Sequence, residues 1–146
     1  MRPLSAGEAE EVFTLRLKIE PDAVASACQV ATPEDRTTLL HALEALEKAQ
    51  ETQPTSGHVA LNRAFHLALV RPGTGLVTLQ TVERLHVLAE RYIHMHLESV
   101  DQSAQARAEH RALLGAWSAG DAGLAASLTT QHIRGTLFNL RRRLGR

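Results

Sequence analysis

The chain has 146 residues, with 16 basic and 16 acidic side chains and one cysteine, Cys28. This length suits one domain with a sizeable core, and a single cysteine excludes both an internal disulfide and a cysteine-based metal site. The balanced charge provides no overall positive field, which argues against direct binding of nucleic acid. No apolar run approaches the ~20 residues that span a bilayer, and no signal-peptide core follows the first residues. We therefore expect a cytoplasmic domain without a membrane anchor.

Apolar residues recur at helical spacing in the first third of the chain. Pro21 interrupts the segment Ser5–Ala31 and predicts two consecutive helices there, because proline lacks the amide hydrogen that a helix interior uses. Thr32 and Pro33 then form a strong start signal for a further helix, which should end near Thr52.

The rest of the chain continues the helical pattern, with turn-forming residues between the segments. Further helices are expected over about 58–70, from Leu76 to about Glu98, from about Asp101 to Gly120, and from Asp121 to about Arg143. No segment shows the alternation typical of a strand, and there is no internal repeat. The sequence therefore predicts an all-α, antiparallel bundle of six or seven helices, formed by residues 1–146 as one domain.

Three histidines, His66, His110 and His132, lie among apolar residues at helical spacing, so their imidazoles should point into the bundle. His110 lies ten residues before Gly120, and His132 lies eleven residues after Asp121. If the two helices form an antiparallel hairpin at this turn, both histidines lie at one level of the bundle. Helical bundles commonly build metal sites from side chains that face one another in this way.

Asn62 lies one helical turn before His66, so the two side chains share a face. Three imidazoles and one oxygen suit zinc, nickel, copper or iron(II), of which we expect zinc or nickel, and they leave positions open for water or a ligand. The periodicity also allows a second interpretation. The histidines would then be three unrelated polar positions of the core, each hydrogen-bonded to backbone.

Four stretches of the sequence, in order, resemble the landmarks of a known family. They are Phe13–Glu20, Asn62–His66, Glu109–Asp121 and finally His132. The order and content resemble the FCD domain, the C-terminal effector domain of the FadR subfamily of GntR-type bacterial transcription regulators. The resemblance covers nearly the whole chain. It implies an all-α bundle with a central cavity that holds a metal and a ligand.

The resemblance also implies a metal site made by one aspartate and three histidines, with a small carboxylate effector bound beside the metal. His66, His110 and His132 occupy the three histidine positions, and Asn62 occupies that of the aspartate. An amide oxygen can coordinate a metal but carries no charge. A divalent ion would then keep its full +2 charge in this site, which should favour an anionic ligand.

Regulators of this family carry a winged helix-turn-helix before the effector domain, whereas this sequence begins almost directly at its first helix. We therefore expect contact with DNA only through a winged helix-turn-helix domain that is absent from this chain. The sequence is either an excised effector domain or a stand-alone binding protein. The resemblance further implies a homodimer.

Four other residues are candidates for contacts to the effector. Arg16 could form an ordinary ion pair with Glu20 four residues later, or it could bind the effector carboxylate through its guanidinium fork. Arg91 is a candidate of the same kind, and Thr136 and Asn139 share the face of His132.

The remaining titratable residues give weaker signals. His86 shows no partner pattern and is expected to be at the surface or half-buried. Glu109 is adjacent to His110 but about 100° away around the helix, so it is poorly directed toward the site. This matters because a hydrolytic metal site would need a nearby general base.

We therefore predict an effector-sensing domain without enzymatic activity, which binds a small organic acid at a histidine-rich metal site. Two alternatives stay open. One is a metal-dependent hydrolase, because three histidines with open positions also build such enzymes. The other is a purely structural dimerisation bundle without a ligand, which is favoured by the neutral Asn62.

Overall fold

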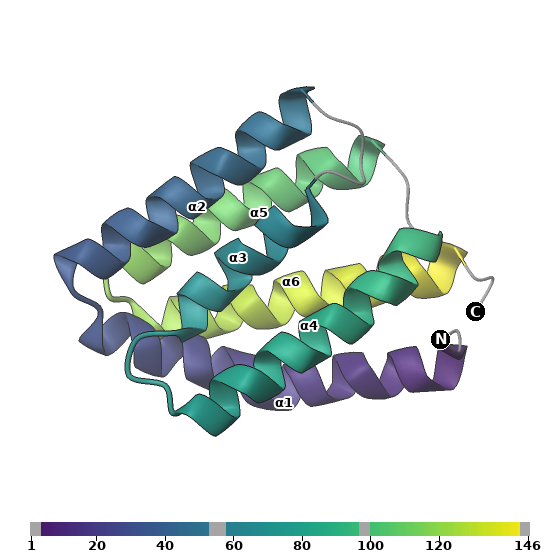
Figure 1. Ribbon diagram of the computed structural model, residues 1–146, viewed down its shortest axis with the longest axis horizontal. Coiled ribbons are helices and arrows are strands. Elements are labelled where there is room, and N and C mark those ends of the chain that lie inside the picture. The colour runs from purple at the N-terminus through teal and green to yellow at the C-terminus, as the bar shows by residue number, and fades with distance from the viewer. Residues whose placement is uncertain (1–3, 53–57, 97–99, 144–146) are drawn as a thin grey trace.

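The computed structural model describes residues 4–52, 58–96 and 100–143, and this part of the chain contains six helices and no strand (Figure 1). The helices are α1 (Ala6–Val30), α2 (Pro33–Thr52), α3 (Val59–Val70), α4 (Leu76–His96), α5 (Val100–Ser118) and α6 (Ala122–Arg143). The predicted all-α fold is therefore confirmed. None of these six helices combines the length and the apolar character that crossing a membrane would need.

The first helix corrects one prediction, because α1 runs without a break through Pro21. It begins at a capping box, in which the Ser5 hydroxyl accepts from the Glu8 amide and the Glu8 carboxylate accepts from the Ser5 amide. A proline inside a helix costs about 3 kcal/mol. Pro21 is buried, and α1 as a whole packs against α6, α4 and α3, so tertiary packing offsets this local cost.

The helices form two groups, one of α1, α4 and α6 and one of α2, α3 and α5, and helices α3 and α5 also contact helices of the first group (Figure 1). Helix α1 lies along α6 and α4, while α2 lies beside α3 and α5. Helices α5 and α6 form the predicted hairpin. Its turn is a Schellman motif around Gly120, whose φ of 72° is left-handed, with the Asp121 amide donating to the Ala116 carbonyl. Asp121 then caps α6 by accepting from the Leu124 amide at 3.1 Å.

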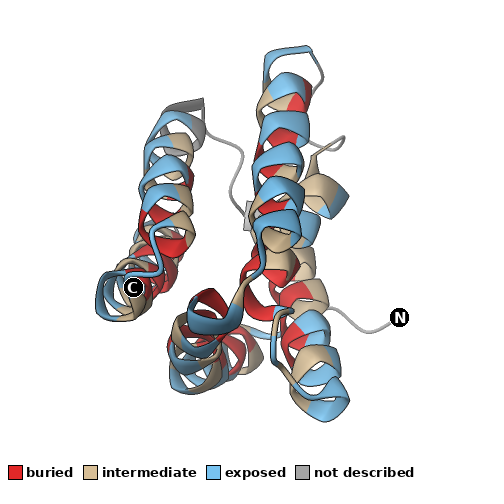
Figure 2. Ribbon diagram, turned by 90° about the vertical axis from the view of Figure 1, so that its left-hand side faces the viewer, coloured by how far each residue is buried: buried red, intermediate tan, exposed pale blue. Residues whose placement is uncertain are grey.

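Buried faces of the helices point toward one another (Figure 2) and form two separate apolar clusters. The first, here called the upper core, includes Leu43, Phe65, Leu69 and Trp117 and draws on all six helices. The second, the lower core, is built from α1, α4 and α6 and includes Phe13, Tyr92, Ile133 and Leu140.

Between the two cores lies a set of buried polar side chains, here called the polar layer. Along α1, for example, Phe13 belongs to the lower core, Arg16 and Glu20 are polar, and Val24 belongs to the upper core. Along α6 the order is reversed, because Ala125 belongs to the upper core, Thr129 and His132 are polar, and Ile133 belongs to the lower core. The members of the layer are Arg16, Glu20, His66, His86, His110, Thr129 and His132. Burying so many polar groups is costly unless they find partners, so their contacts decide what the layer does.

A buried histidine cluster as candidate metal centre

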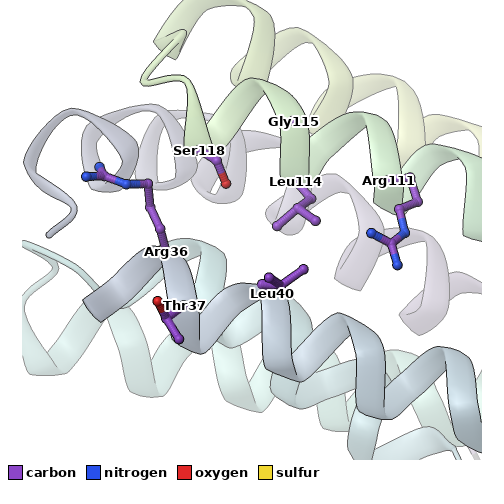
Figure 3. Close-up of a pocket in the computed structure, with 7 residues that line it drawn as sticks. All are labelled: Arg36, Thr37, Leu40, Arg111, Leu114, Gly115 and Ser118. Atoms are coloured by element: carbon purple, nitrogen blue, oxygen red, sulfur yellow. The ribbon is translucent and has the colours of Figure 1, made fainter. Parts of the chain in front are cut away.

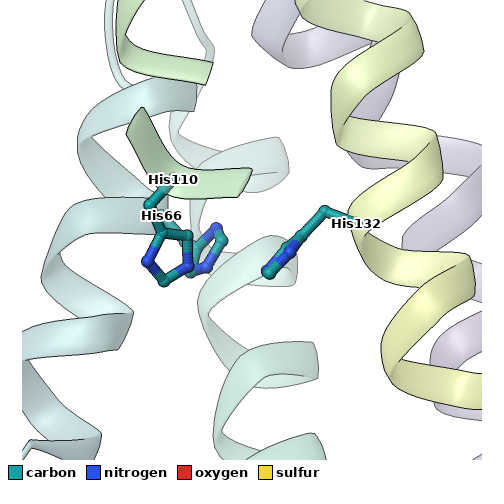
Figure 4. A group of neighbouring side chains, drawn as sticks. All are labelled: His66, His110 and His132. Carbon is teal, nitrogen blue, oxygen red and sulfur yellow. The ribbon is translucent and has the colours of Figure 1, made fainter. Parts of the chain in front are cut away.

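The three histidines singled out by the sequence meet inside the polar layer (Figure 4). His66 comes from α3, His110 from α5 and His132 from α6, and all three are buried. Each offers one nitrogen such that the three atoms lie within 4.8 Å of one another. The ring centroids are 5.0 to 5.2 Å apart. Small side-chain rotations would therefore let one ion reach all three nitrogens.

The surroundings keep two of these imidazoles neutral at physiological pH. Burial, together with the nearby His110 and His132, holds the pKa of His66 well below its usual range. Burial and the adjacent His132 likewise lower the pKa of His110 to about 3. A neutral imidazole has a free lone pair, which is the form of histidine that binds a metal.

His110 provides the most direct test of whether a metal fits here. Its side chain is buried, and neither ring nitrogen has a hydrogen-bond partner among the described residues. Buried polar groups in native proteins nearly always have a partner, and a missing one calls for an explanation. A bound metal would supply a partner for one of the two nitrogens. Three imidazoles are also a suitable donor set for zinc or nickel, so the residues present fit such an ion.

A second group of the polar layer corrects the prediction for His86, which is buried rather than at the surface or half-buried. Its Nε2 lies 2.7 Å from Oε1 of Glu20, and its ring centroid lies 5.2 Å from that of His66. Arg16 donates from Nε to the same carboxylate at 2.9 Å. Arg16 is therefore in the i,i+4 ion pair that the sequence allowed, but this pair is buried.

Arg16, Glu20 and His86 form a buried group in which the negative charge of Glu20 balances the positive charge of Arg16. Burial alone would raise the pKa of Glu20, but Arg16 and His86 outweigh it and lower the pKa to about 2. Glu20 is therefore ionised and compensates the charge of Arg16. Arg16 also stacks over the ring of Phe13 at 5.3 Å and is close enough to contribute to the low pKa of His66.

The structure also corrects the expected direction of Glu109. Its Oε1 lies 2.6 Å from Nδ1 of His132, so the carboxylate reaches across from α5 to α6. The sequence contains a signal for this contact. Glu109 lies eleven residues before Gly120, and His132 lies eleven residues after Asp121, so the two are at the same distance from the turn.

The other predicted site residues occupy half-buried positions. Asn62 lies one turn before His66 on α3, and its role as a fourth ligand stays a prediction. Arg91, Thr136 and Asn139 are also half-buried, and the Thr136 hydroxyl donates to the His132 carbonyl at 3.1 Å. Their effector contacts stay predictions as well.

An open hollow of about 440 Å³ lies between α2 and α5 (Figure 3). Its lining includes Arg36 and Leu40 from α2 together with Arg111 and Leu114 from α5. Arg111 is held by an ion pair with Glu47. The hollow is lined by none of the polar-layer residues, so the central cavity implied by the resemblance stays a prediction.

Comparison with known proteins supports the fold and the family. Residues 11–135 match the FCD domain family. The HTH-type transcriptional regulator McbR of Escherichia coli strain K12 is 29% identical over 94 residues, which are 64% of this chain and 42% of McbR. A solved structure of Escherichia coli McbR/YncC superposes with a TM-score of 0.85 at 23% identity, covering 97% of this chain and 68% of that one.

This chain thus spans about two fifths of the length of its curated relative. The family match, by contrast, covers most of the chain and includes all three clustered histidines. The chain therefore belongs to the FCD domain family, as its resemblance to the effector domains of GntR-type transcription regulators predicts.

Proposed function

We propose that this domain senses a small carboxylate through a divalent transition metal held by His66, His110 and His132. The observation that carries the proposal is His110, whose two buried ring nitrogens have no hydrogen-bond partner in the described part of the chain and lie beside two other imidazoles. Zinc or nickel would supply a positively charged centre with open coordination positions. Asn62 is the proposed fourth ligand from the protein.

The charge of the site favours an anionic effector. Histidine and asparagine ligands are neutral, so a divalent ion keeps its full charge until an anion joins it. Arg16 lies near this centre and uses Nε and Nη2 to bind Glu20, which leaves Nη1 outside that pair. A carboxylate between the metal and Arg16 would meet positive charge on two sides. Arg91, Thr136 and Asn139 are proposed as further contacts.

In a complete regulator, the effector would act by changing how the helices pack around the polar layer. Its members come from α1, α3, α4, α5 and α6, so a ligand bound there touches most of the bundle. Such a ligand shifts the equilibrium between two packings only if it binds one of them more tightly. We propose that this shift moves two DNA-binding domains relative to each other on a cytoplasmic homodimer.

A metal titration tests the proposal. Metal-free protein should bind Zn²⁺ or Ni²⁺ with a stoichiometry of one, and the His66→Ala and His110→Ala variants should lose this binding. His41, an exposed histidine on α2, provides the matched control, and His41→Ala should titrate like the wild type. Wild-type protein that binds neither ion would overturn the proposal.

Two further variants separate the roles of the other residues. Asn62→Asp should tighten metal binding, because it adds a negative charge to the site; unchanged affinity would remove Asn62 from the ligand set. Arg16→Gln should weaken binding of small mono- and dicarboxylates to the metal-loaded protein while leaving metal affinity similar. If the carboxylates bind Arg16→Gln as well as they bind the wild type, Arg16 has no part in effector binding.

The contact between Glu109 and His132 weakens the hydrolase alternative. A hydrolytic metal site needs a base that can take a proton from a bound water. The Glu109 carboxylate is already engaged by the His132 ring at 2.6 Å, so it is not free for that role. The nitrogens of His110 have no partner within residues 4–52, 58–96 and 100–143, and this weakens the purely structural alternative, because buried nitrogens without a partner cost stability in a core that binds no ligand.

A further inference from the structure

Two consecutive residues of α5 face different parts of the same site. His110 points into the histidine cluster, while Glu109 reaches the ring of His132 on α6. Successive helical residues point about 100° apart, which allows one residue to face the centre and its neighbour to face the adjacent helix. Helix α5 thus supplies one candidate ligand and also contacts another.

The Glu109 carboxylate is held in place from more than one side. Its Oε1 is 2.6 Å from Nδ1 of His132, and its Oε2 accepts from the Gln105 side chain at 3.3 Å. The same Oε2 lies 3.9 Å from where a Cβ on Gly135 would be, so the carboxylate packs against α6 one turn beyond His132. Its side chain is 30% exposed.

The charge state of Glu109 determines which partner donates. A glutamate carboxylate is ordinarily ionised at neutral pH, and an ionised carboxylate can only accept hydrogen bonds. Its 2.6 Å contact with Nδ1 of His132 therefore needs a donor on the ring. The proton must then be on Nδ1 of His132, and in the neutral ring Nε2 has the free lone pair.

We propose that Glu109 is a positioning residue that holds His132 in its Nδ1–H tautomer, so that Nε2 is the metal ligand. This inference rests on the proposed metal site and adds a residue to it. A carboxylate behind a metal-bound histidine fixes the ring orientation and raises the basicity of the ligand. Glu109 also places a negative charge one hydrogen bond from a set of otherwise neutral ligands, where Asn62 supplies none.

The tautomer can be observed without any metal. In ¹⁵N-labelled metal-free protein at pH 7.5, long-range proton–nitrogen correlation spectra should show His132 with the proton on Nδ1. Glu109→Gln keeps the size of the side chain, but its amide can donate as well as accept, so the variant should show a mixture of the two tautomers. A wild-type ring with its proton on Nε2 would overturn the proposal.

Zinc titration then tests the consequence for binding. Glu109→Gln should bind Zn²⁺ more weakly by on the order of 10–100-fold. The matched control is Glu47→Gln, which removes a carboxylate that pairs with Arg111 on the surface, and its affinity should equal that of the wild type. Circular dichroism of the metal-free variants checks that both are folded.

The outcomes separate this inference from the proposed function. If the wild-type protein binds neither Zn²⁺ nor Ni²⁺, the metal site itself is refuted, and the role of Glu109 is refuted with it. If the wild type binds Zn²⁺ and Glu109→Gln binds it equally well, only the role of Glu109 is refuted. The same holds if a folded Glu109→Gln protein keeps His132 entirely in the Nδ1–H form.

Discussion

Trp117 and His110 lie two turns apart on one face of α5, and both rings are buried. They differ in whether their ring nitrogens have hydrogen-bond partners. In the upper core, the Trp117 Nε1 donates to the Leu69 carbonyl on α3 at 2.9 Å. In the polar layer, neither nitrogen of His110 has a partner among the described residues. The tryptophan completes its hydrogen bond within the chain and stabilises the fold. The His110 ring packs against Phe65 at 4.9 Å, but its nitrogens add no hydrogen bond to the described part of the fold, which agrees with the proposed role of His110 as a metal ligand.

Replacing Trp117 should have the largest effect on stability of the variants that test this difference. Trp117→Ala should lower the free energy of unfolding by about 3–5 kcal/mol, because it leaves a cavity in the upper core and an unpaired Leu69 carbonyl. Urea denaturation of metal-free protein measures the loss. Phe138, an aromatic residue of α6 that is 59% exposed, is the control, and Phe138→Ala should change stability by only about 0.5 kcal/mol. Equal losses for both variants would contradict the assignment of Trp117 to the core.

Lowering the pH should reduce the free energy of unfolding through the titratable groups of the polar layer, because the apolar cores contain no such dependence. The pKa of His110 is lowered from 6.5 to about 3 in the folded protein, so below pH 6.5 the unfolded chain binds more protons than the folded one. Stability is therefore complete above pH 6.5 and falls as the pH decreases. His110 alone should account for about 2 kcal/mol between pH 6.5 and 5.0.

Glu20 adds to the same trend at lower pH. Its pKa of about 2 in the folded protein lies below the ordinary value of 4.5, so its contribution is present above pH 4.5 and is lost as the pH falls toward 2. Urea midpoints measured from pH 7.5 down to about pH 2 in the metal-free protein follow both effects. A midpoint that is constant between pH 7.5 and 5 would contradict the low pKa of His110.

Replacing His110 should have the smallest effect on stability, and this result would distinguish His110 most clearly from Trp117. His110→Leu should change the stability of the metal-free protein at pH 7.5 by less than about 1 kcal/mol. The imidazole that it removes makes no hydrogen bond to any residue that the structure describes, and leucine fills the space with apolar atoms. The variant should also lose the His110 share of the acid destabilisation. A loss of stability as large as that of Trp117→Ala would mean that His110 has a structural partner after all.

The sequence predicted most of the fold because helical periodicity and capping residues are local signals. The α5–α6 hairpin is the clearest case, since Gly120 and Asp121 mark its turn and the spacing places His110 and His132 at one level. Pro21 was misinterpreted for the opposite reason. Its local preference breaks a helix, and only the packing of α1 against distant helices overrides that preference.

The clustering of His66, His110 and His132 was predictable from the sequence, but the contacts that surround them were not. His86 pairs with Glu20, which lies 66 residues earlier in the chain, and no local pattern reveals such a contact. The apolar neighbours Val82 and Ala89 on the same helical face did indicate that His86 points inward. Glu109 was judged by its angle relative to His110 alone. Its contact depends on how α5 is rotated against α6, which is a property of the pair of helices.

The length of the three-residue connection between α5 and α6, Ala119 to Asp121, affects the geometry of the whole site. This length fixes the registration of α6 against α5, and with it the meeting of His132 with both Glu109 and His110. One inserted residue at the start of α6 would turn the rest of that helix by about 100° and advance it by about 1.5 Å. His132 would then leave the cluster although every side chain of the site was still present. The clustering of the three histidines thus depends on the length of this turn as well as on the histidines themselves.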